Sequence, residues 1–364
     1  MSEKSTIQDI ARLAGVSKAT VSRVLNQKPD VDPATRERIL RIIEEQGYTP
    51  NLAASSLADG HSRLVALLIP SFTWPLIPDI MRGVAETIEQ TQYELLLYSI
   101  SDLYHEEVRS EVIHRILETK LTSGLLAIFP DPTSRYLATL HRPEFPIVLL
   151  DDQEVPPENV PWVTVNNRLG AYEATRHLLQ LGHRRIVHIQ GPLTYQVSQD
   201  RYRGYCEALE EAGLPVDPTL VIPGDFKPAS GQVGAKILFD LPERPTAIFA
   251  ASDYMAYGVM TAAREYGLHL PEDVALVGFD DLPSSAHMPI PLSTVRQPFY
   301  EMGQVALTLL LSLVETSHSL DDRQTRWKYT STSPGERGES ARKPLRLEMA
   351  TPLIVRKSSR PSTF

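Results

Sequence analysis

The chain has 364 residues, of which 42% are hydrophobic, so it is too long for one ordinary domain and apolar enough to bury full cores. Its single cysteine, Cys206, excludes an internal disulfide and fits a reducing compartment. No apolar run reaches the roughly 18 residues that a membrane-spanning helix needs, and no hydrophobic signal region precedes the first polar helix pattern. We therefore expect a cytoplasmic protein with no membrane partner.

The net charge of −9 is distributed unevenly. Residues 1–60 contain 8 Lys and Arg against 8 Asp and Glu, so the remainder carries the whole excess. Contact of this first segment with a nucleic acid would therefore depend on where its cations point and not on bulk charge.

The stretch TIQDIARLAGVSKATVSRVLN predicts two short helices joined by a tight turn. Thr6 followed by Asp9 is a capping-box start, and Gly15 supplies the turn. Ser17 can cap the second helix. A third amphipathic helix follows Asp32 and ends at Gly47.

Three short helices in this order predict a helix-turn-helix, whose second helix enters the major groove of DNA. Arg23 can donate a bidentate pair to guanine, Lys18 can reach guanine or phosphate, and Ala19 can touch a thymine methyl group. The alternative is an ordinary three-helix domain with a solvated Lys and Arg face.

This segment and the following VDPATRERILRIIEEQGYTPNLAASSLADG resemble the N-terminal module of the LacI/GalR family of bacterial transcription regulators. The resemblance implies a DNA-binding domain at 1–50 and a hinge helix at 51–60 in which Leu57 wedges into the minor groove, the alternative being a flexible linker. Ser55 departs from the family, which often has Arg there. The side chains expected to contact DNA are Thr6, Ile7, Ser17, Lys18, Ala19, Ser22, Arg23, Asn26, Thr35, Tyr48, Asn51, Ala54 and Leu57.

From residue 61 to 364, short apolar runs alternate with helix-length segments. The runs are LVALLIP, YELLLYSI, GLLAIFP, IVLLDD, RIVHIQGP, TAIFAASD and ALVGFDD. This alternation indicates parallel sheets covered by helices, and there are too many strands for one compact sheet. We expect two doubly wound, Rossmann-like subdomains. The resemblance to the LacI/GalR family implies that they are of the periplasmic-binding-protein type and form an effector-binding and dimerisation domain. The polar segment near 317–345 is expected to be an insertion, either a surface loop or a disordered segment.

Ligands of such folds bind at the carboxyl ends of the strands, in the crevice between the halves. Carboxylates and an arginine can orient hydroxyls there, while aromatic rings cover apolar sugar faces. The stretches QDRYRGYCEAL and VALVGFDDLPSSAHMPIPLSTVRQP resemble the same family, which implies ligand contacts for Arg201 and Asp280. For Asp253 and Asp281, helix capping is an equal alternative. The expected effector-binding residues are Phe72, Thr73, Trp74, Asp151, Arg201, Phe226, Ser252, Asp253, Asp280 and Phe299.

The effector is expected to be a sugar or sugar derivative, with a purine corepressor as the alternative because Phe72 and Trp74 could stack on a base. Ser252 and Asn166 differ from residues common in sugar-binding members. No catalytic motif and no histidine spacing typical of a metal site occurs, so we expect no enzyme activity, metal or cofactor. A free-standing sugar-binding protein would share the body fold but would not need residues 6–58.

The sequence therefore predicts a sequence-specific, allosteric transcription regulator, in the repressor role, located in the cytoplasm at the nucleoid. We expect a homodimer, with a tetramer as the alternative, on a pseudo-palindromic double-stranded operator. An inducer, the family's commoner case, would loosen DNA binding; a corepressor would tighten it.

Overall fold

The computed structural model describes residues 5–25, 30–48, 62–100, 106–119, 121–129, 134–151, 159–320 and 345–359. The chain divides into two compact units, Met1–Arg63 and Leu64–Phe364. Among the described residues, none of the helices combines the length and the apolar character needed to cross a bilayer.

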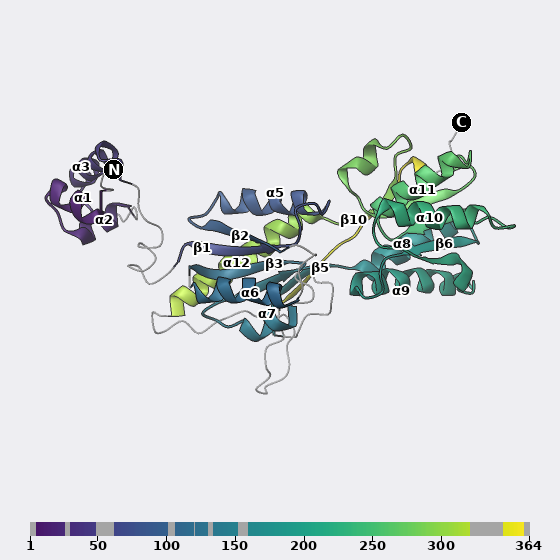
Figure 1. Cartoon of the computed structure of the whole chain (residues 1–364), viewed down its shortest axis with the longest axis horizontal. Coiled ribbons are helices and arrows are strands. Elements are labelled where there is room, and N and C mark those ends of the chain that lie inside the picture. The colour runs from purple at the N-terminus through teal and green to yellow at the C-terminus, as the bar shows by residue number, and fades with distance from the viewer. Residues whose placement is uncertain are drawn as a thin grey trace, which may run out of the picture. The chain divides into compact units, whose positions relative to one another are not determined.

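The first unit is a bundle of three helices, α1 (Ile7–Ala14), α2 (Lys18–Leu25) and α3 (Pro33–Glu45), shown in purple in Figure 1. The predicted capping box is present, because the Thr6 hydroxyl accepts from the amide of Asp9 while the Asp9 carboxylate accepts from the amide of Thr6. Gly15 adopts a φ of 66°, which a side chain would strain. The small core centres on the fully buried Ile10, Val21 and Ile39.

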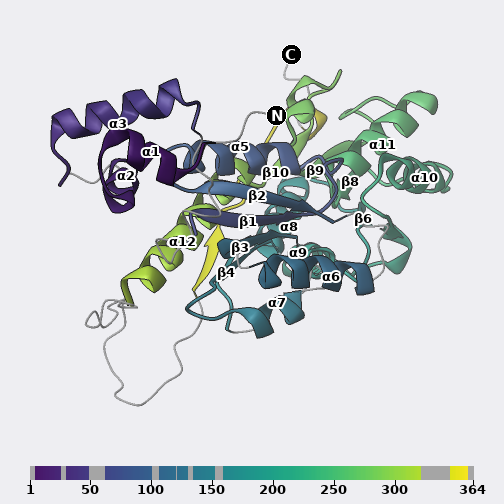
Figure 2. The ribbon, with the colours of Figure 1, turned by 60° about the vertical axis from the view of Figure 1, so that its left-hand side comes forward.

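The second unit begins with a six-stranded sheet in the order β11-β5-β4-β3-β1-β2, whose paired strands are all parallel. Its strands are β1 (Leu64–Ile69), β2 (Glu94–Ser99), β3 (Thr122–Ile128), β4 (Ile147–Leu150), β5 (Trp162–Val165) and β11 (Arg346–Met349). Helices α5 (Ile77–Ile88) and α12 (Phe299–Leu320) cover one face, and α6 (Glu106–Glu118) and α7 (Ser134–Leu140) the other (Figure 2).

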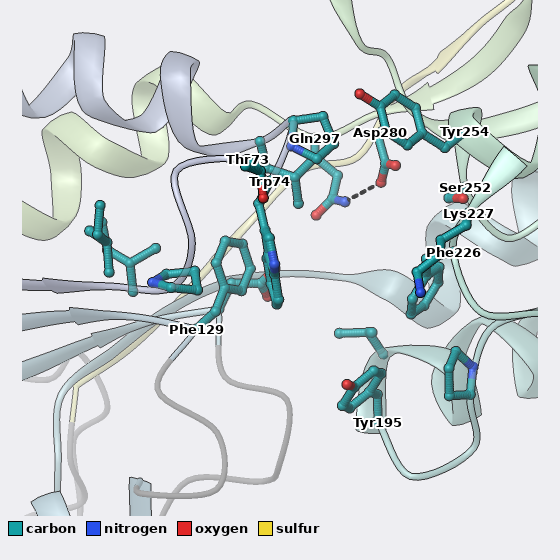
Figure 3. Close-up of a pocket in the computed structure, with 18 of the residues that line it drawn as sticks. Thr73, Trp74, Phe129, Tyr195, Phe226, Lys227, Ser252, Tyr254, Asp280 and Gln297 are labelled. Carbon is teal, nitrogen blue, oxygen red and sulfur yellow. Dashed lines mark hydrogen bonds between the residues drawn. The ribbon is translucent and has the colours of Figure 1, made fainter. Parts of the chain in front are cut away.

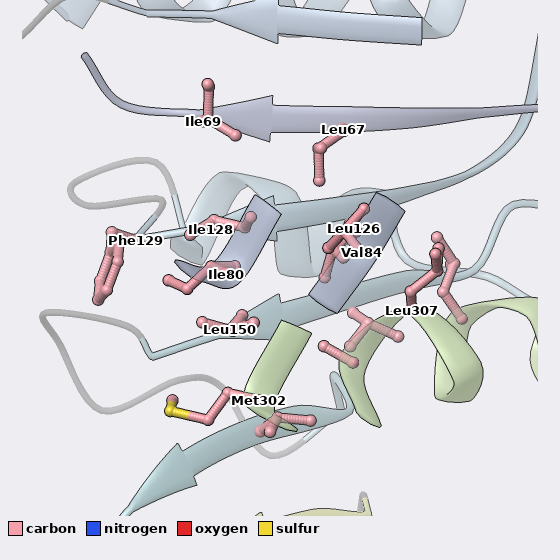
Figure 4. Close-up of a cluster of buried hydrophobic side chains, with 14 of the residues drawn as sticks. Leu67, Ile69, Ile80, Val84, Leu126, Ile128, Phe129, Leu150, Met302 and Leu307 are labelled. Atoms are coloured by element: carbon pink, nitrogen blue, oxygen red, sulfur yellow. The ribbon is translucent and has the colours of Figure 1, made fainter. Parts of the chain in front are cut away.

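The side chains of β1 show why both faces are covered. Val65, Leu67 and Ile69 pack into the core beneath α5 and α12, while Ala66 and Leu68 pack on the opposite face. Figure 4 shows the first of these cores, where strand residues meet side chains of α5 and α12. A continuous apolar run is typical of a strand buried on both faces.

The second sheet has the order β12-β10-β9-β8-β6-β7 and is parallel except for the β10–β12 pair. Its strands are β6 (Ile186–Gln190), β7 (Val221–Pro223), β8 (Ala247–Ala250), β9 (Ala275–Asp280), β10 (Ser293–Arg296) and β12 (Leu353–Ile354). Helices α8 (Asn167–Gln180) and α9 (Gln196–Glu211) pack on one face, and α10 (Pro228–Phe239) and α11 (Asp253–Glu265) on the other.

The described chain passes between the two sheets three times: after β5, after β10 and after β11. Hydrogen bonds tie these crossing segments together. Asn166 Nδ2 donates to Glu348 Oε1 at 2.7 Å, and Thr351 Oγ1 donates to the carbonyl of Asn166 at 3.2 Å. The amide of Arg296 donates to the carbonyl of Pro352 at 2.9 Å. Hydrogen bonds therefore join the three crossing segments into one short connection between the two sheets, which we call the inter-sheet hinge.

The predicted fold class is confirmed, and each predicted apolar run overlaps a strand. Helix α12 continues to Leu320, which is four residues into the segment near 317–345 that is expected to be an insertion. Residues 321–344 and the expected hinge helix at 51–60 lie outside the described residues.

Candidate functional site

A cavity of about 710 Å³ lies between the two sheets of the second unit, at the carboxyl ends of their strands. Residues after β1, β3 and β4 line one side, and residues after β6, β8 and β9 line the other. This is where a doubly wound sheet leaves backbone and side chains free to meet a ligand.

Aromatic side chains stand on opposite walls of the cavity (Figure 3). Trp74 and Phe129 come from the first sheet, with ring centroids 5.6 Å apart. Tyr195 and Phe226 come from the second, with centroids 6.2 Å apart and planes only 13° from parallel. A flat or disc-shaped ligand with apolar faces can therefore contact rings on two sides.

Four residues that line the cavity have an unusual backbone. Phe129, Asp151, Phe226 and Asp280 have φ values of 47°, 48°, 64° and 123°, in a region that glycine normally occupies. Each such residue costs about 1–3 kcal/mol and persists only where its surroundings impose the conformation. In the described chain, just one further non-glycine residue, Asp281, has a positive φ. The strain is thus concentrated where the strands end at the cavity.

Arg201 is the centre of a buried polar cluster and is only 4% exposed. Its Nε donates to Asn167 Oδ1 at 2.9 Å, and its Nη1 donates to the carbonyl of Ala251 and lies 3.7 Å from Asp280 Oδ1. The guanidinium carbon also lies 3.7 Å from the centroid of the Phe279 ring. Packing and hydrogen bonds therefore fix the orientation of this cation before any ligand arrives.

Two carboxyl groups of the cavity have shifted pKa values. Burial raises the pKa of Asp151 to about 6, while the Arg201 cation and a hydrogen bond from Thr164 oppose the shift. Burial likewise raises the pKa of Asp280 to about 6, with Arg201 and Gln297 opposing it. Both groups are hydrogen-bond acceptors when ionised, and hydrogen bonds from a ligand would stabilise their ionised forms.

The described residues that line the cavity carry a small negative charge. The cations Arg201 and Lys227 face three carboxylates, those of Asp151, Asp225 and Asp280, which leaves one formal negative charge in excess. Such a site offers no surplus cation for a phosphate group, so it suits a neutral, polar ligand.

Seven of the ten expected effector-binding residues line this cavity, and the other three, Phe72, Asp253 and Phe299, lie outside its lining. The seven are Thr73, Trp74, Asp151, Arg201, Phe226, Ser252 and Asp280. Phe72 is 57% exposed and is not among the lining residues, and Phe299 is 4% exposed because it packs into the core of the first sheet.

Asp253, the third, is fully buried behind the cavity wall. Its carboxylate accepts from the amide of Leu282 at 2.9 Å, from Ser285 Oγ at 2.5 Å and from Thr294 Oγ1 at 2.6 Å. Burial and the neighbouring Asp280 raise its pKa to about 8. Asp253 therefore anchors the loop after β9, which is a structural role.

Other lining residues were missed by the sequence analysis, among them Phe129, Tyr195, Tyr254, Lys227 and Gln297. Gln297 lies on the crossing segment after β10 and is 5% exposed. Its Nε2 donates to Asp280 Oδ1 at 2.7 Å, which fixes the amide orientation, and its buried Oε1 has no hydrogen-bond partner in the described part of the chain. A buried acceptor without a donor is costly, so a ligand hydroxyl or N–H that reached this Oε1 would satisfy it.

On the first unit, α2 presents Lys18, Ala19 and Arg23 to solvent, opposite the buried Val21 and Val24. Of the other expected DNA contacts, Thr6 and Ser17 are exposed, and Ile7, Ser22, Thr35 and Tyr48 are partly buried. The hydroxyls of Thr6, Ser17 and Thr35 all take part in bonds at helix starts. Asn26, Asn51, Ala54 and Leu57 lie outside the described residues.

Comparisons with known proteins cover both units. Residues 6–51 match the family described as bacterial regulatory proteins, lacI family, and residues 175–359 match a periplasmic binding protein-like domain. Catabolite control protein A of Priestia megaterium is 33% identical over 331 residues, which is 88% of this chain and 98% of that protein.

Two solved structures are similar over almost the whole chain. A Lac repressor dimer bound to operator and the anti-inducer ONPF has a TM-score of 0.81 and 26% identity, covering 98% of this chain and 99% of that one. A complex of the transcriptional regulator CelR with cellobiose has a TM-score of 0.65 and 31% identity, covering 98% and 100%. The chain therefore belongs to the LacI family of bacterial regulatory proteins and is a DNA-binding transcription regulator, not an enzyme.

Proposed function

We propose that this regulator is a repressor controlled by a neutral carbohydrate, which binds in the cavity between the two sheets. The observation that carries the proposal is the pair of aromatic walls, Trp74 with Phe129 and Tyr195 with Phe226, on either side of a set of fixed polar groups. Family membership shows that the protein is a transcription regulator, and the proposal adds the chemical class of the effector.

A sugar ring matches both the aromatic walls and the polar groups between them. Its C–H faces pack against aromatic rings, and its hydroxyls at the rim donate to carboxylates and accept from a guanidinium. Asp151, Asp280 and the Oε1 of Gln297 supply the acceptors, and Arg201 supplies donors. The similar CelR structure was solved with cellobiose, and the cavity volume is within the range of ligand pockets that hold molecules of that size.

A purine is the competing effector, because stacked rings also suit a nucleobase. The acceptors favour the carbohydrate: the carboxylates of Asp151 and Asp280 and the amide oxygen of Gln297 are among the lining groups, and a sugar has a hydroxyl for each of them. A purine has few N–H donors and would leave some buried acceptors without partners, at a cost for each.

For DNA, we propose that residues 1–50 form the reading domain, 51–60 a hinge, and 61–364 the effector-binding and dimerisation domain. Lys18, Ala19 and Arg23 would contact base edges from α2 in the major groove. A homodimer places two such helices on a pseudo-palindromic operator, as the similarity to an operator-bound Lac repressor dimer supports. Such a protein acts in the cytoplasm, at the nucleoid.

For regulation, we propose that the carbohydrate is an inducer. The ligand would contact residues of both sheets and Gln297 on the crossing segment. Its binding energy would therefore favour one arrangement of the two sheets about the inter-sheet hinge over another. If that arrangement disfavours the spacing of the two reading helices that the operator needs, the ligand weakens operator binding. The operator then weakens ligand binding by the same factor.

The test is a thermal-shift screen of the full-length protein against mono- and disaccharides, sugar phosphates and purines, followed by titration of each hit. A ligand that binds the folded state raises the melting temperature by mass action. We expect a neutral sugar to stabilise the protein, and Gln297→Leu to weaken this effect. Arg203→Ala is the matched control, since Arg203 is exposed and outside the cavity.

A purine hit that depends on Gln297 would replace the carbohydrate proposal. Sugars that stabilise the control and the Gln297 variant equally would show that they bind elsewhere. Addition of the hit to an operator complex then shows whether the ligand lowers or raises operator affinity, because an inducer releases DNA and a corepressor retains it.

A further inference from the structure

An acidic side chain lies next to the arginine that we propose to read a base. Asp30 Oδ2 lies 3.5 Å from Arg23 Nη1, and the two side chains are 54% and 59% exposed. The pair joins α2 to the segment that precedes α3, so it is not a contact between neighbours on one helix.

The backbone at Asp30 is held in place by the two residues that follow it. Val31 is buried in the small core of the first unit. The carboxylate of Asp32 accepts from the amide of Thr35 at 3.0 Å and caps α3. Asp30 is thus presented beside Arg23 by a fixed turn of the chain.

A carboxylate in this position has two effects on DNA binding. A guanidinium has donors on two edges, so it can hold a carboxylate with one edge while the other forms a bidentate pair with guanine. In addition, a negative charge next to the reading helix is repelled by phosphates, which weakens every complex that lacks the compensating base contact.

We propose that Asp30 is a specificity-determining residue, which positions the Arg23 guanidinium for one base and penalises binding to other sequences. This inference rests on the proposed role of Arg23 at base edges. Asp30 lowers the total affinity for DNA and raises the ratio between specific and non-specific binding.

The first unit contains a matched control for this ion pair. Glu37 and Arg41 lie one turn apart on α3, with Oε1 and Nη2 3.7 Å apart and side chains 79% and 65% exposed. Glu37→Gln removes the same charge from the same small unit as Asp30→Asn, but it leaves the pair on the reading helix intact.

The experiment uses the full-length protein throughout. Selection from a randomised duplex pool first defines the preferred site. Dissociation constants are then measured by fluorescence anisotropy for that site, for each single base-pair change and for a random duplex. The variants are Asp30→Asn, Arg23→Ala, the double variant and Glu37→Gln, each first checked for an unchanged melting transition.

We expect Asp30→Asn to bind the random duplex several-fold more tightly. It should also lose up to about fivefold discrimination at one base pair in each half-site, the position that Arg23→Ala also relaxes, because an exposed pair of this kind contributes little more. In the Arg23→Ala background, Asp30→Asn should cause no further loss of discrimination. Glu37→Gln should leave base discrimination unchanged.

The inference is overturned if Asp30→Asn and Glu37→Gln behave alike, if the loss is spread over all positions, or if it persists without Arg23. In each of these cases the wild-type protein still selects a site, so the DNA-reading proposal stands. If the wild-type protein enriches no sequence, both proposals fall.

Discussion

Replacement of Asp151 by asparagine should make the protein more stable than wild type at neutral pH. Asp151 is 3% exposed at the end of β4, and burial raises its pKa from 3.8 to about 6. The folded state therefore binds its proton more tightly than the unfolded chain. The stability that Asp151 contributes is fully present below about pH 4 and is lost as the pH rises through 6.

The shift of roughly two pKa units corresponds to about 3 kcal/mol between pH 4 and pH 8. Asparagine cannot ionise, so Asp151→Asn should gain about that much relative to wild type over this range. Aspartate and asparagine both tolerate a positive φ such as the 48° at this position, so the substitution should add no backbone strain.

The assay is urea unfolding of the ligand-free wild type and variant at several pH values between 4 and 8, with the difference in unfolding free energy plotted against pH. Thr164→Val is the companion variant, because it removes the 3.0 Å hydrogen bond that lowers the pKa of Asp151. Thr164→Val should enlarge the total loss of stability with rising pH and extend this loss to higher pH. A difference between Asp151→Asn and wild type that does not change with pH would refute the argument.

Three further predictions concern the cavity, the helix packing and the first unit. Trp74→Ala should weaken carbohydrate binding by about tenfold or more in calorimetry while operator binding of the free protein persists; unchanged affinity would remove Trp74 from the site. Gly204→Ala should lower the unfolding free energy by about 3 kcal/mol, because a Cβ would lie 2.1 Å from the carbonyl of Arg168, whereas Gly213→Ala, with a φ of 69° and open space, should cost about 1 kcal/mol. Equal losses would contradict this. Thr6→Ala should cost α1 about 1 kcal/mol, seen as faster amide hydrogen exchange of that helix alone; unaltered exchange would show that the cap is not needed.

The sequence located seven of the described strands through their apolar runs, since most of these strands are buried on both faces and such strands are short, apolar and bounded by polar residues. It did not predict α10, whose sequence contains Gly231 and Gly234 and shows little helical periodicity. Gly231 is needed for packing, since a Cβ there would lie 2.1 Å from the carbonyl of Met255 on α11. A glycine that permits close approach of two helices cannot be distinguished in the sequence from one that ends a helix.

The cavity was predicted in outline, because polar residues after parallel strands gather at one edge. Its exact lining depends on tertiary packing. Phe129 and Phe299 are both phenylalanines near a strand end, yet one turns into the cavity with a φ of 47° and the other enters the core. Gln297 carried no local signal, since its importance comes from its position on a crossing segment.

The interleaved path of the chain also determines when each part can fold during synthesis. The three-helix unit is complete once residue 48 has left the ribosome. The first sheet, however, still lacks α12 and β11, and the second lacks β12, until residues 299–354 emerge. At the usual rate of translation this interval lasts on the order of tens of seconds. Nascent chains therefore display a folded three-helix unit before the second unit, which contains the cavity, is complete. We expect the unfinished sheets to need chaperones most during this interval.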